Sequence, residues 1–310
     1  MSQLLESFLG ACPGAVSQGI LWGIMALGVA VTYRILDYAD LTVDSSLCTG
    51  AAVNAVLLLA GVHPIAALAA ATVVGMAAGL LTGLLHTQLG IPAILSGILS
   101  QLALYSINMR ILGRSNLPLL KVETLLTLRS PATAIIVGGI FALAMVAFLT
   151  WFFTTERGYA IRATGSNGGM ARAQGINTAS TTVLALMISN GLVGLAGGLL
   201  SQYQGYADVN MGRGAIVIGL ASVILGEAIP FLRSRFSLRL IASVVGGVIY
   251  YLVITLVLQA GLDTNDLKLF SAAVVALALG IPNLRQKAAA KRLAKSALRV
   301  GQDGQRKETV

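Results

Sequence analysis

Side chains that could carry a proton or hold an ion are few in this chain, and they avoid its long apolar segments. Only 12 Asp and Glu and 2 His occur among 310 residues. Asp44 and Glu227 come closest to the centre of an apolar segment, yet each lies near a predicted end, as do His63 and His86. Ion-coupled carriers usually hold their ions on carboxylates near the bilayer centre. The sequence therefore offers no obvious ion relay.

The sequence also lacks the patterns of a nucleotide, metal or disulfide site. The phosphate-binding pattern G-x-x-x-x-G-K-[ST] is absent. Cys12 and Cys48 lie in apolar surroundings and imply neither a disulfide framework nor a metal site. We expect no catalytic residue, no metal and no cofactor on this chain, so that any ATP is hydrolysed by another chain.

The longest clearly polar stretch before the C-terminal tail covers residues 155–177. Ser166 or Asn167 can cap a short helix that runs to about Gln174, because a side-chain oxygen there accepts a hydrogen bond from a free N–H. Gly175 can end that helix in the left-handed conformation. The pattern predicts a compact helix parallel to the membrane.

This predicted helix carries Met170 and Arg172, which suit a groove on a cytosolic partner. The alternative is an ordinary solvated connection whose arginines only set the orientation of the chain.

The composition indicates that the polar segments described above connect membrane helices. Hydrophobic residues make up 56% of the chain and charged residues 11%, against about 25% charged in globular domains. Lipid leaves backbone groups without water, and the long apolar runs lack the alternation of a barrel strand. The fold class predicted is an all-α, polytopic membrane helix bundle. The basic excess, 21 against 12, favours a cytoplasmic anchor over nucleic-acid binding, because many basic residues lie in the tail 285–310.

A span needs about 20 mostly apolar residues, and this rule predicts about nine spans (roughly 8 to 10). The predicted spans are 16–33, 44–61, 64–86, 90–109, 132–153, 180–202, 214–232, 240–260 and 268–284. Residues 1–15 are expected to form a separate amphipathic helix on the membrane surface.

Basic residues set the predicted orientation. The loop 154–179, the arginines between 233 and 239, and the tail 285–310 fall on one side of a nine-span chain. The positive-inside rule makes that side cytoplasmic and places the N-terminus outside. The basic loop 110–131 falls outside as well, which makes the span count the weakest part of the prediction.

Two similar turns indicate an internal duplication. YADLTV begins at Tyr38 and YADVNM at Tyr206, an offset of 168 residues. Within each turn, Asp40 or Asp208 is expected to cap the next helix rather than to bind solute.

The same offset relates a first repeat, about 16–109, to a second repeat, about 180–284. One linking span, 132–153, separates the two, so the predicted repeats have opposite orientations. Inverted repeats are a common construction of transporters.

Within the predicted spans, the spacing of small residues indicates close helix packing, whereas the polar residues have two interpretations. Gly75, Gly79 and Gly83 form a smooth stripe that allows close helix packing. The polar residues that could line a solute path are Asn54, Gln101, Asn108, Ser189 and Asn190. Each of them could instead bond a neighbouring helix.

The run GYAIRATGSNGGMARAQGIN resembles the coupling loop of permease subunits of bacterial ABC importers for branched-chain amino acids, ribose and related solutes. The stretches ILDYADLTVDSS and GYADVNMGRGAIVIGLASVILGE resemble a subgroup labelled as tryptophan or aromatic amino-acid importers. The resemblance covers roughly residues 16–284. The chain departs from it at Asp44, Ser45 and Ser46, where a glycine is expected.

This resemblance implies the type II importer fold in the bacterial plasma membrane, with the C-terminus cytoplasmic. Two permease copies would form the path, two cytosolic ATPase subunits would bind ATP and Mg²⁺, and an external solute-binding lipoprotein would deliver an amino acid or similar solute. Residues 163–175 would form the coupling helix. The implied ATPase-coupling residues are Arg162, Ala163, Gly165, Asn167, Met170, Arg172 and Gly175.

The external loops 203–213, 110–131 and 261–267 could dock the binding protein, or they could be plain solvated turns. Their exposed charges would be Asp208, Arg213, Asp263 and Asp266. For the whole chain, the alternatives are a secondary carrier with inverted repeats and, from another class, a channel or a structural membrane subunit.

Overall fold

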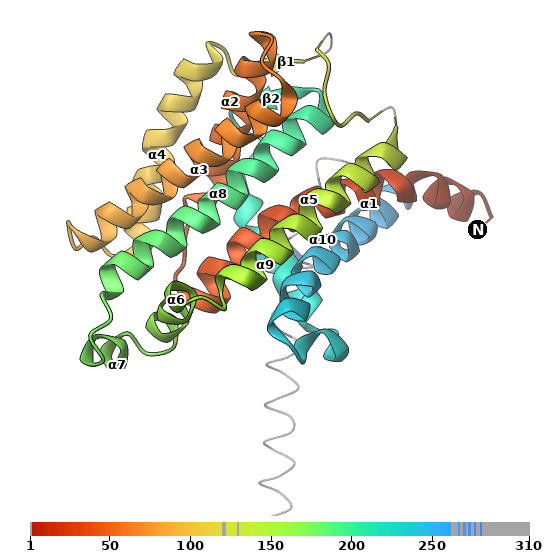
Figure 1. Cartoon of the computed structure of the whole chain (residues 1–310). Helices are drawn as coiled ribbons and strands as arrows, with labels where there is room; N and C mark the ends of the chain where they lie inside the picture. The colour runs from red at the N-terminus through yellow and green to blue at the C-terminus, as the bar shows by residue number, and fades with distance from the viewer. Residues whose placement is uncertain are drawn as a thin grey trace, which may run out of the picture.

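The computed structural model describes residues 2–119, 122–128 and 130–261, with isolated positions between 266 and 280. The elements are α1 (Ser2–Ala30), the π-helical η1 (Val31–Leu36), α2 (Val43–Leu59), α3 (Pro64–Thr87), α4 (Ala93–Leu112), β1 (Asn116–Pro118), α5 (Pro131–Phe152), α6 (Glu156–Ser166), α7 (Gly168–Ala173), α8 (Thr178–Gln204), β2 (Tyr206–Asp208), α9 (Ala215–Glu227), the 3-10 helix η2 (Pro230–Arg233) and α10 (Phe236–Gln259). Figure 1 shows them as a bundle of long helices with α6 and α7 at one end.

The predicted helical membrane bundle is confirmed. Every predicted span up to residue 260 contains a helix, but the span 214–232 is divided between the short α9 and η2. The span 268–284 lies largely outside the described residues, as does the tail 285–310. Among the described residues, 5 helices are long and apolar enough to cross a membrane, and α2 and α9 are shorter apolar helices. The count of nine stays a prediction.

Two details of the predicted fold were wrong. The helix expected over residues 1–15 is not a separate element, because α1 continues through Pro13 as one helix from Ser2 to Ala30. The fold is also not purely helical, because β1 and β2 form an antiparallel pair in which Leu117 lies opposite Ala207. This pair places the loop after α4 beside the loop after α8.

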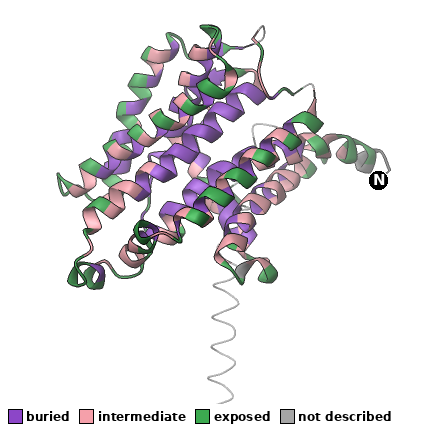
Figure 2. Ribbon diagram, viewed as in Figure 1, coloured by how far each residue is buried: buried purple, intermediate pink, exposed green. Residues whose placement is uncertain are grey.

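The central element is α8, which is buried along most of its length (Figure 2). The predicted glycine stripe packs against it. A Cβ atom built at Gly79 would lie 2.9 Å from the Cα of Met187, and one at Gly83 would lie 3.0 Å from the Cα of Val183. Such close backbone approach explains the stripe, because tight packing supplies much of the attraction between helices in lipid.

Close contacts recur at the offset of 168 residues. A Cβ atom at Gly23 would lie 2.9 Å from the Cα of Val244, where α1 packs on α10. One at Gly191 would lie 2.7 Å from the Cγ of Met76, where α8 packs on α3. Adding 168 to Gly23 and to Met76 gives Gly191 and Val244, so the two packing contacts correspond residue by residue.

The helices in these contacts alternate in direction. The Tyr203 hydroxyl donates to the Gly14 carbonyl (3.4 Å) and the Ser189 hydroxyl to the Gly28 carbonyl (2.8 Å), so α1 and α8 are antiparallel. The contacts named above make α3 antiparallel to α8. A Cβ atom at Gly19 would lie 3.1 Å from the amide nitrogen of Val248, which together with the contact of Gly23 with Val244 makes α10 antiparallel to α1. Helices α1 and α3 therefore run one way, and α8 and α10 run the other.

The short helix α2 begins near the middle of the bundle. Near its start, the Ser46 hydroxyl donates to the Asn190 side chain, midway along α8 (2.6 Å). Further along, the Asn54 amide donates to the Ser201 hydroxyl near the end of α8 (2.9 Å). Helix α2 therefore runs from the bundle centre toward the β1–β2 end.

Helix α9 begins at the same central position and runs the other way. The Asp44 carboxylate, in the first turn of α2, accepts hydrogen bonds from the backbone N–H groups of Gly214 (3.0 Å) and Ile216 (2.9 Å) at the start of α9. At its other end, Glu227 pairs with Arg34, just beyond α1. With 13 residues, α9 is about 20 Å long. It is thus too short to cross a hydrocarbon core of about 30 Å.

Candidate functional site

The polar segment 155–177 folds as two helices rather than one. The Asn167 side chain accepts a hydrogen bond from the Met170 N–H (2.9 Å) and so caps α7, and Gly175 has a φ of +81°. The predicted cap and left-handed stop are confirmed. Helix α6 was missed, although Thr155 followed by Glu156 is a helix-start pattern; the Thr155 hydroxyl accepts from the Gly158 N–H (3.4 Å).

Helix α6 is braced against the ends of the membrane helices. A Cβ atom at Gly158 would collide with the backbone of Phe153 at the end of α5. A Cβ atom at Gly165 would lie 2.8 Å from the Cα of Leu36 in η1. Ile161 is fully buried between these contacts. The two glycines, which lower helix propensity, are thus used for close approach.

The predicted coupling residues divide into two groups. Arg162 lies 5.0 Å from the ring centroid of Phe236 at the start of α10, and Gly165 contacts η1, so both face the bundle. Met170 is 63% exposed on α7. Arg172 is also exposed, and it donates to the Thr178 hydroxyl (3.4 Å). Ala163, which follows Arg162 in α6, is half-buried. The α6–α7 unit therefore has one face on the membrane helices and another that is open.

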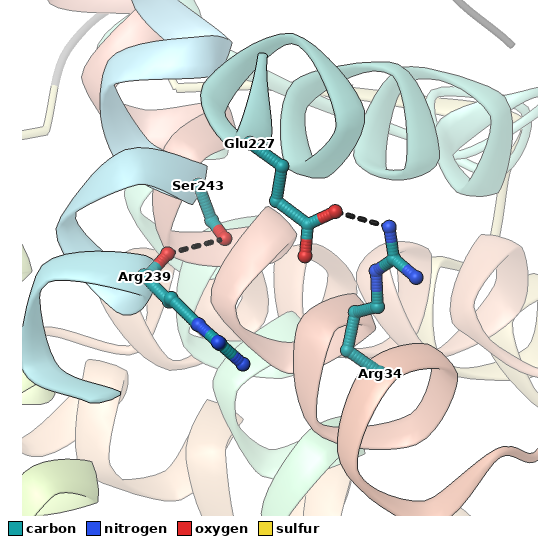
Figure 3. Close-up of polar contacts among 4 residues, drawn as sticks. All are labelled: Arg34, Glu227, Arg239 and Ser243. Carbon is teal, nitrogen blue, oxygen red and sulfur yellow. Dashed lines mark hydrogen bonds and ion pairs between the residues drawn. The ribbon is translucent and has the colours of Figure 1, made fainter. Parts of the chain in front are cut away.

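An ion pair joins the ends of α1 and α9 beside this unit. Arg34 and Glu227 form an ion pair (Figure 3). Both line a cavity of about 260 Å³, whose walls also include Phe236 and Ser243. The Ser243 hydroxyl donates to the backbone carbonyl of Arg239 (3.3 Å). Sequence reasoning missed this pair because its members are 193 residues apart.

Reversing either charge is expected to break this contact between α1 and α9. Arg34→Glu and Glu227→Arg should each lower the thermal unfolding temperature in detergent, and the double variant should recover most of the loss. Because the Arg34 side chain is 48% exposed, solvent screening limits the coupling energy to about 0.5–1 kcal/mol. Added salt should shrink it. A double variant no better than the worse single variant would show that the pair contributes nothing.

A second cavity lies where α2 and α9 begin. It has a volume of about 430 Å³, and its lining includes Asp44, Gln101, Tyr105 and Arg213. Sequence reasoning noted Asp44 as an acidic residue near the end of a predicted span and as a departure from a family pattern, and Arg213 as an external charge. Asp44 and Arg213 meet because α2 packs on α9, and apart from the aligned repeats no sequence pattern predicts that packing.

The five polar residues proposed for the solute path do not lie together in the structure. Of these five residues, Gln101 lines the cavity at the start of α2 and α9, which we call the central cavity. The others are fully buried and bond neighbouring segments: Asn54 to Gly198 and Ser201, Asn108 to Ser45, Ser189 to Gly28, and Asn190 to Asp40. The structure thus provides helix-packing partners for these four, and a path role for them stays a prediction.

Asp40 and Asp208 occupy matching turns but do not cap the helices that follow. Each accepts a hydrogen bond from the backbone N–H two residues on, Thr42 (2.9 Å) and Asn210 (2.7 Å) respectively. The predicted helix caps are corrected to local turns. The second oxygen of Asp40 is buried against Asn190, whereas that of Asp208 accepts from Asn116 on β1 (3.2 Å).

Comparison with known proteins identifies the relatives of the chain. The family model described as "Branched-chain amino acid transport system / permease component" matches residues 14–281. The chain is 40% identical to the "Tyrosine transport system permease protein" of Clostridioides difficile (strain R20291), over 87% of this chain and 90% of the relative. It is 31% identical to "Uncharacterized protein RP368" of Rickettsia prowazekii, over 86% of this chain and 95% of that protein.

A more distant relative is the "Inner membrane ABC transporter permease protein YjfF" of Escherichia coli, 31% identical over 66% of this chain and 63% of that protein. No solved structure shows a significant match to the chain.

Proposed function

The chain belongs to the family of permease components of branched-chain amino acid transport systems, and we propose that two copies of it form the translocation path of an importer. It is a multi-pass plasma-membrane subunit of an ABC transporter, with no enzymatic activity of its own. In our proposal, two cytosolic ATPase subunits bind ATP and Mg²⁺ and drive transport. An external solute-binding protein delivers the solute.

The proposed solute is an amino acid or a similar small molecule, and an aromatic amino acid is the first candidate. The name of the relative from Clostridioides difficile refers to tyrosine transport, and that protein shares 40% identity with this chain. A solute passed on by an external protein needs no tight site in the membrane, so selection would rest mainly with that protein.

We propose further that residues 16–109 and 180–284 are inverted repeats. The antiparallel courses of α1 and α8, and the equivalent contacts of Gly23 with Val244 and of Gly191 with Met76, support this proposal. Related halves of opposite orientation can open a central path to either side in turn.

The observation that carries the proposed coupling is the position of the α6–α7 unit. Helix α6 packs on η1 through Gly165, while Met170 and Arg172 are exposed on the neighbouring α7. A push from a cytosolic partner on α7 would therefore be transmitted to the end of α1 as a rigid-body shift. The basic residues Arg157, Arg162 and Arg172 support a cytoplasmic position for the unit.

The test is co-purification with the ATPase. Arg172→Glu is expected to reduce the amount of ATPase that co-purifies with the permease and to abolish ATP-driven uptake, because the exposed cation of α7 is replaced by an anion. Arg114→Glu makes the same change on an exposed arginine beside β1, at the other end of the bundle, and should leave ATPase recovery unchanged.

Normal ATPase recovery and uptake with Arg172→Glu would overturn the docking assignment. Solute uptake by the purified permease alone under an ion gradient would instead favour the secondary carrier.

A further inference from the structure

The central cavity lies at a position with unusual electrostatics. Helices α2 and α9 both begin there and run to opposite ends of the bundle, so their positive N-terminal ends meet at its centre. Asp44, in the first turn of α2, lies between them. Helix ends that lie inside the membrane form solute sites in many transporters, because free N–H groups and helix dipoles can face a charged group.

The cavity holds two opposite charges that do not pair with each other. Both Asp44 oxygens accept backbone N–H groups, from Gly214 and Ile216. Within the described part of the chain, the exposed guanidinium of Arg213 has no hydrogen-bond or ion-pair partner. An anion and an unpartnered cation on the walls of one cavity suit a ligand that carries one charge of each sign.

The remaining walls suit the rest of an amino acid. Gln101 and Tyr105 provide amide and hydroxyl groups, while Ile98 and Leu102 provide apolar surface. All four are on α4, the helix that covers this side of the cavity. The volume of about 430 Å³ lies within the range of small-molecule sites, about 300–1,000 Å³. It is ample for one amino acid.

We propose that this cavity is the point at which the permease contacts its solute, and that it takes a zwitterionic α-amino acid with an apolar or aromatic side chain. Arg213 binds the α-carboxylate, for which its planar fork of donors is well shaped. Asp44 attracts the α-ammonium group, and the α4 wall contacts the side chain. The assignment rests on the proposed importer function.

The first test uses the complete transporter, with its ATPase and binding protein, in proteoliposomes. L-tyrosine is the labelled probe, and L-leucine is the second. Arg213→Gln should lower uptake at least about tenfold, the effect of losing a charge-assisted hydrogen bond, while the ATPase still co-purifies. Arg213→Lys, which keeps the charge, should retain more uptake than Arg213→Gln. The matched control Arg235→Gln, at the exposed start of α10, should stay within about twofold of the unmodified protein.

The second test does not depend on uptake. In Gln101→Cys, the rate of thiol labelling at position 101 is followed by mass spectrometry, and L-tyrosine is expected to slow it. Tyramine, which lacks the carboxylate, should have no such effect.

Different results would contradict the proposed import function and the assignment of the cavity. If the unmodified transporter moves neither amino acid with ATP, the proposed amino-acid import is wrong. If it does, but Arg213→Gln transports normally or L-tyrosine leaves labelling at position 101 unchanged, only the assignment of this cavity is overturned.

Discussion

Gly79→Val is expected to remove most of the folded protein from detergent extracts and to lower the unfolding temperature of the remainder. A Cβ atom at this position would collide with the Leu186 carbonyl and lie 2.9 Å from the Cα of Met187. The obstacle is backbone, which cannot rotate away as a side chain can. Overpacking a well-packed core costs about 1–3 kcal/mol, and we expect the upper end of that range because α8 is buried along most of its length.

The matched control is Gly139→Val on α5, where an added Cβ meets nothing within 4 Å. It adds the same side chain to another apolar helix and should leave the unfolding temperature nearly unchanged. Gly247→Val tests the repeat relationship, since position 247 follows Gly79 by 168 residues and lies against Gly19 and Gly23. It should be as harmful as Gly79→Val. Equal stability of Gly79→Val and Gly139→Val would show that close packing of α3 on α8 is not required.

The features that the sequence predicted well depend on short stretches of chain. Apolar runs located the helices because each run is long enough to cross lipid. The glycine stripe on α3 and the Asn167 cap followed from spacings of three or four residues. These patterns act within one helix or one turn, so no knowledge of the packing partner was needed.

The features that were missed depend on contacts between distant segments. Helix α6 was not predicted. Gly158 and Gly165 weaken a helix locally, and only their contacts with α5 and η1 explain them. The separate helix predicted over residues 1–15 was also wrong, because α1 is continuous from Ser2 to Ala30.

The meeting of the short helices was also beyond the sequence. By composition, α2 and α9 resemble ordinary spans, and their common starting point appears only when Asp44 is seen to bond Gly214 and Ile216. For the same reason, Asn54 and Gln101 were equal candidates for a solute path. The first is buried against α8 and the second lines the cavity, a difference that depends on which face of its helix each residue occupies.

The packing of α6 connects the open face of α7 to the central cavity through a short series of contacts. Gly165 contacts Leu36 in η1, and Arg34 in the same π-helical turn pairs with Glu227 at the end of α9. The other end of α9 begins at Asp44, in the cavity wall. In the proposed mechanism, a displacement of α6 would reach α9 through two contacts, and α9 is short enough to move as a rigid rod.

Gly165→Leu should interrupt this connection and nearly abolish ATP-driven uptake, while ATP hydrolysis and ATPase co-purification persist. Leucine cannot fit against η1, because even a Cβ atom would lie 2.8 Å from the Cα of Leu36. Helix α6 must then lift from the end of α1, although the exposed face of α7 is unchanged. Ser166→Leu, at the adjacent exposed position, is the matched control and should retain uptake. Loss of the ATPase with Gly165→Leu would point to docking rather than transmission, and normal uptake would mean that the contact between α6 and η1 carries no motion.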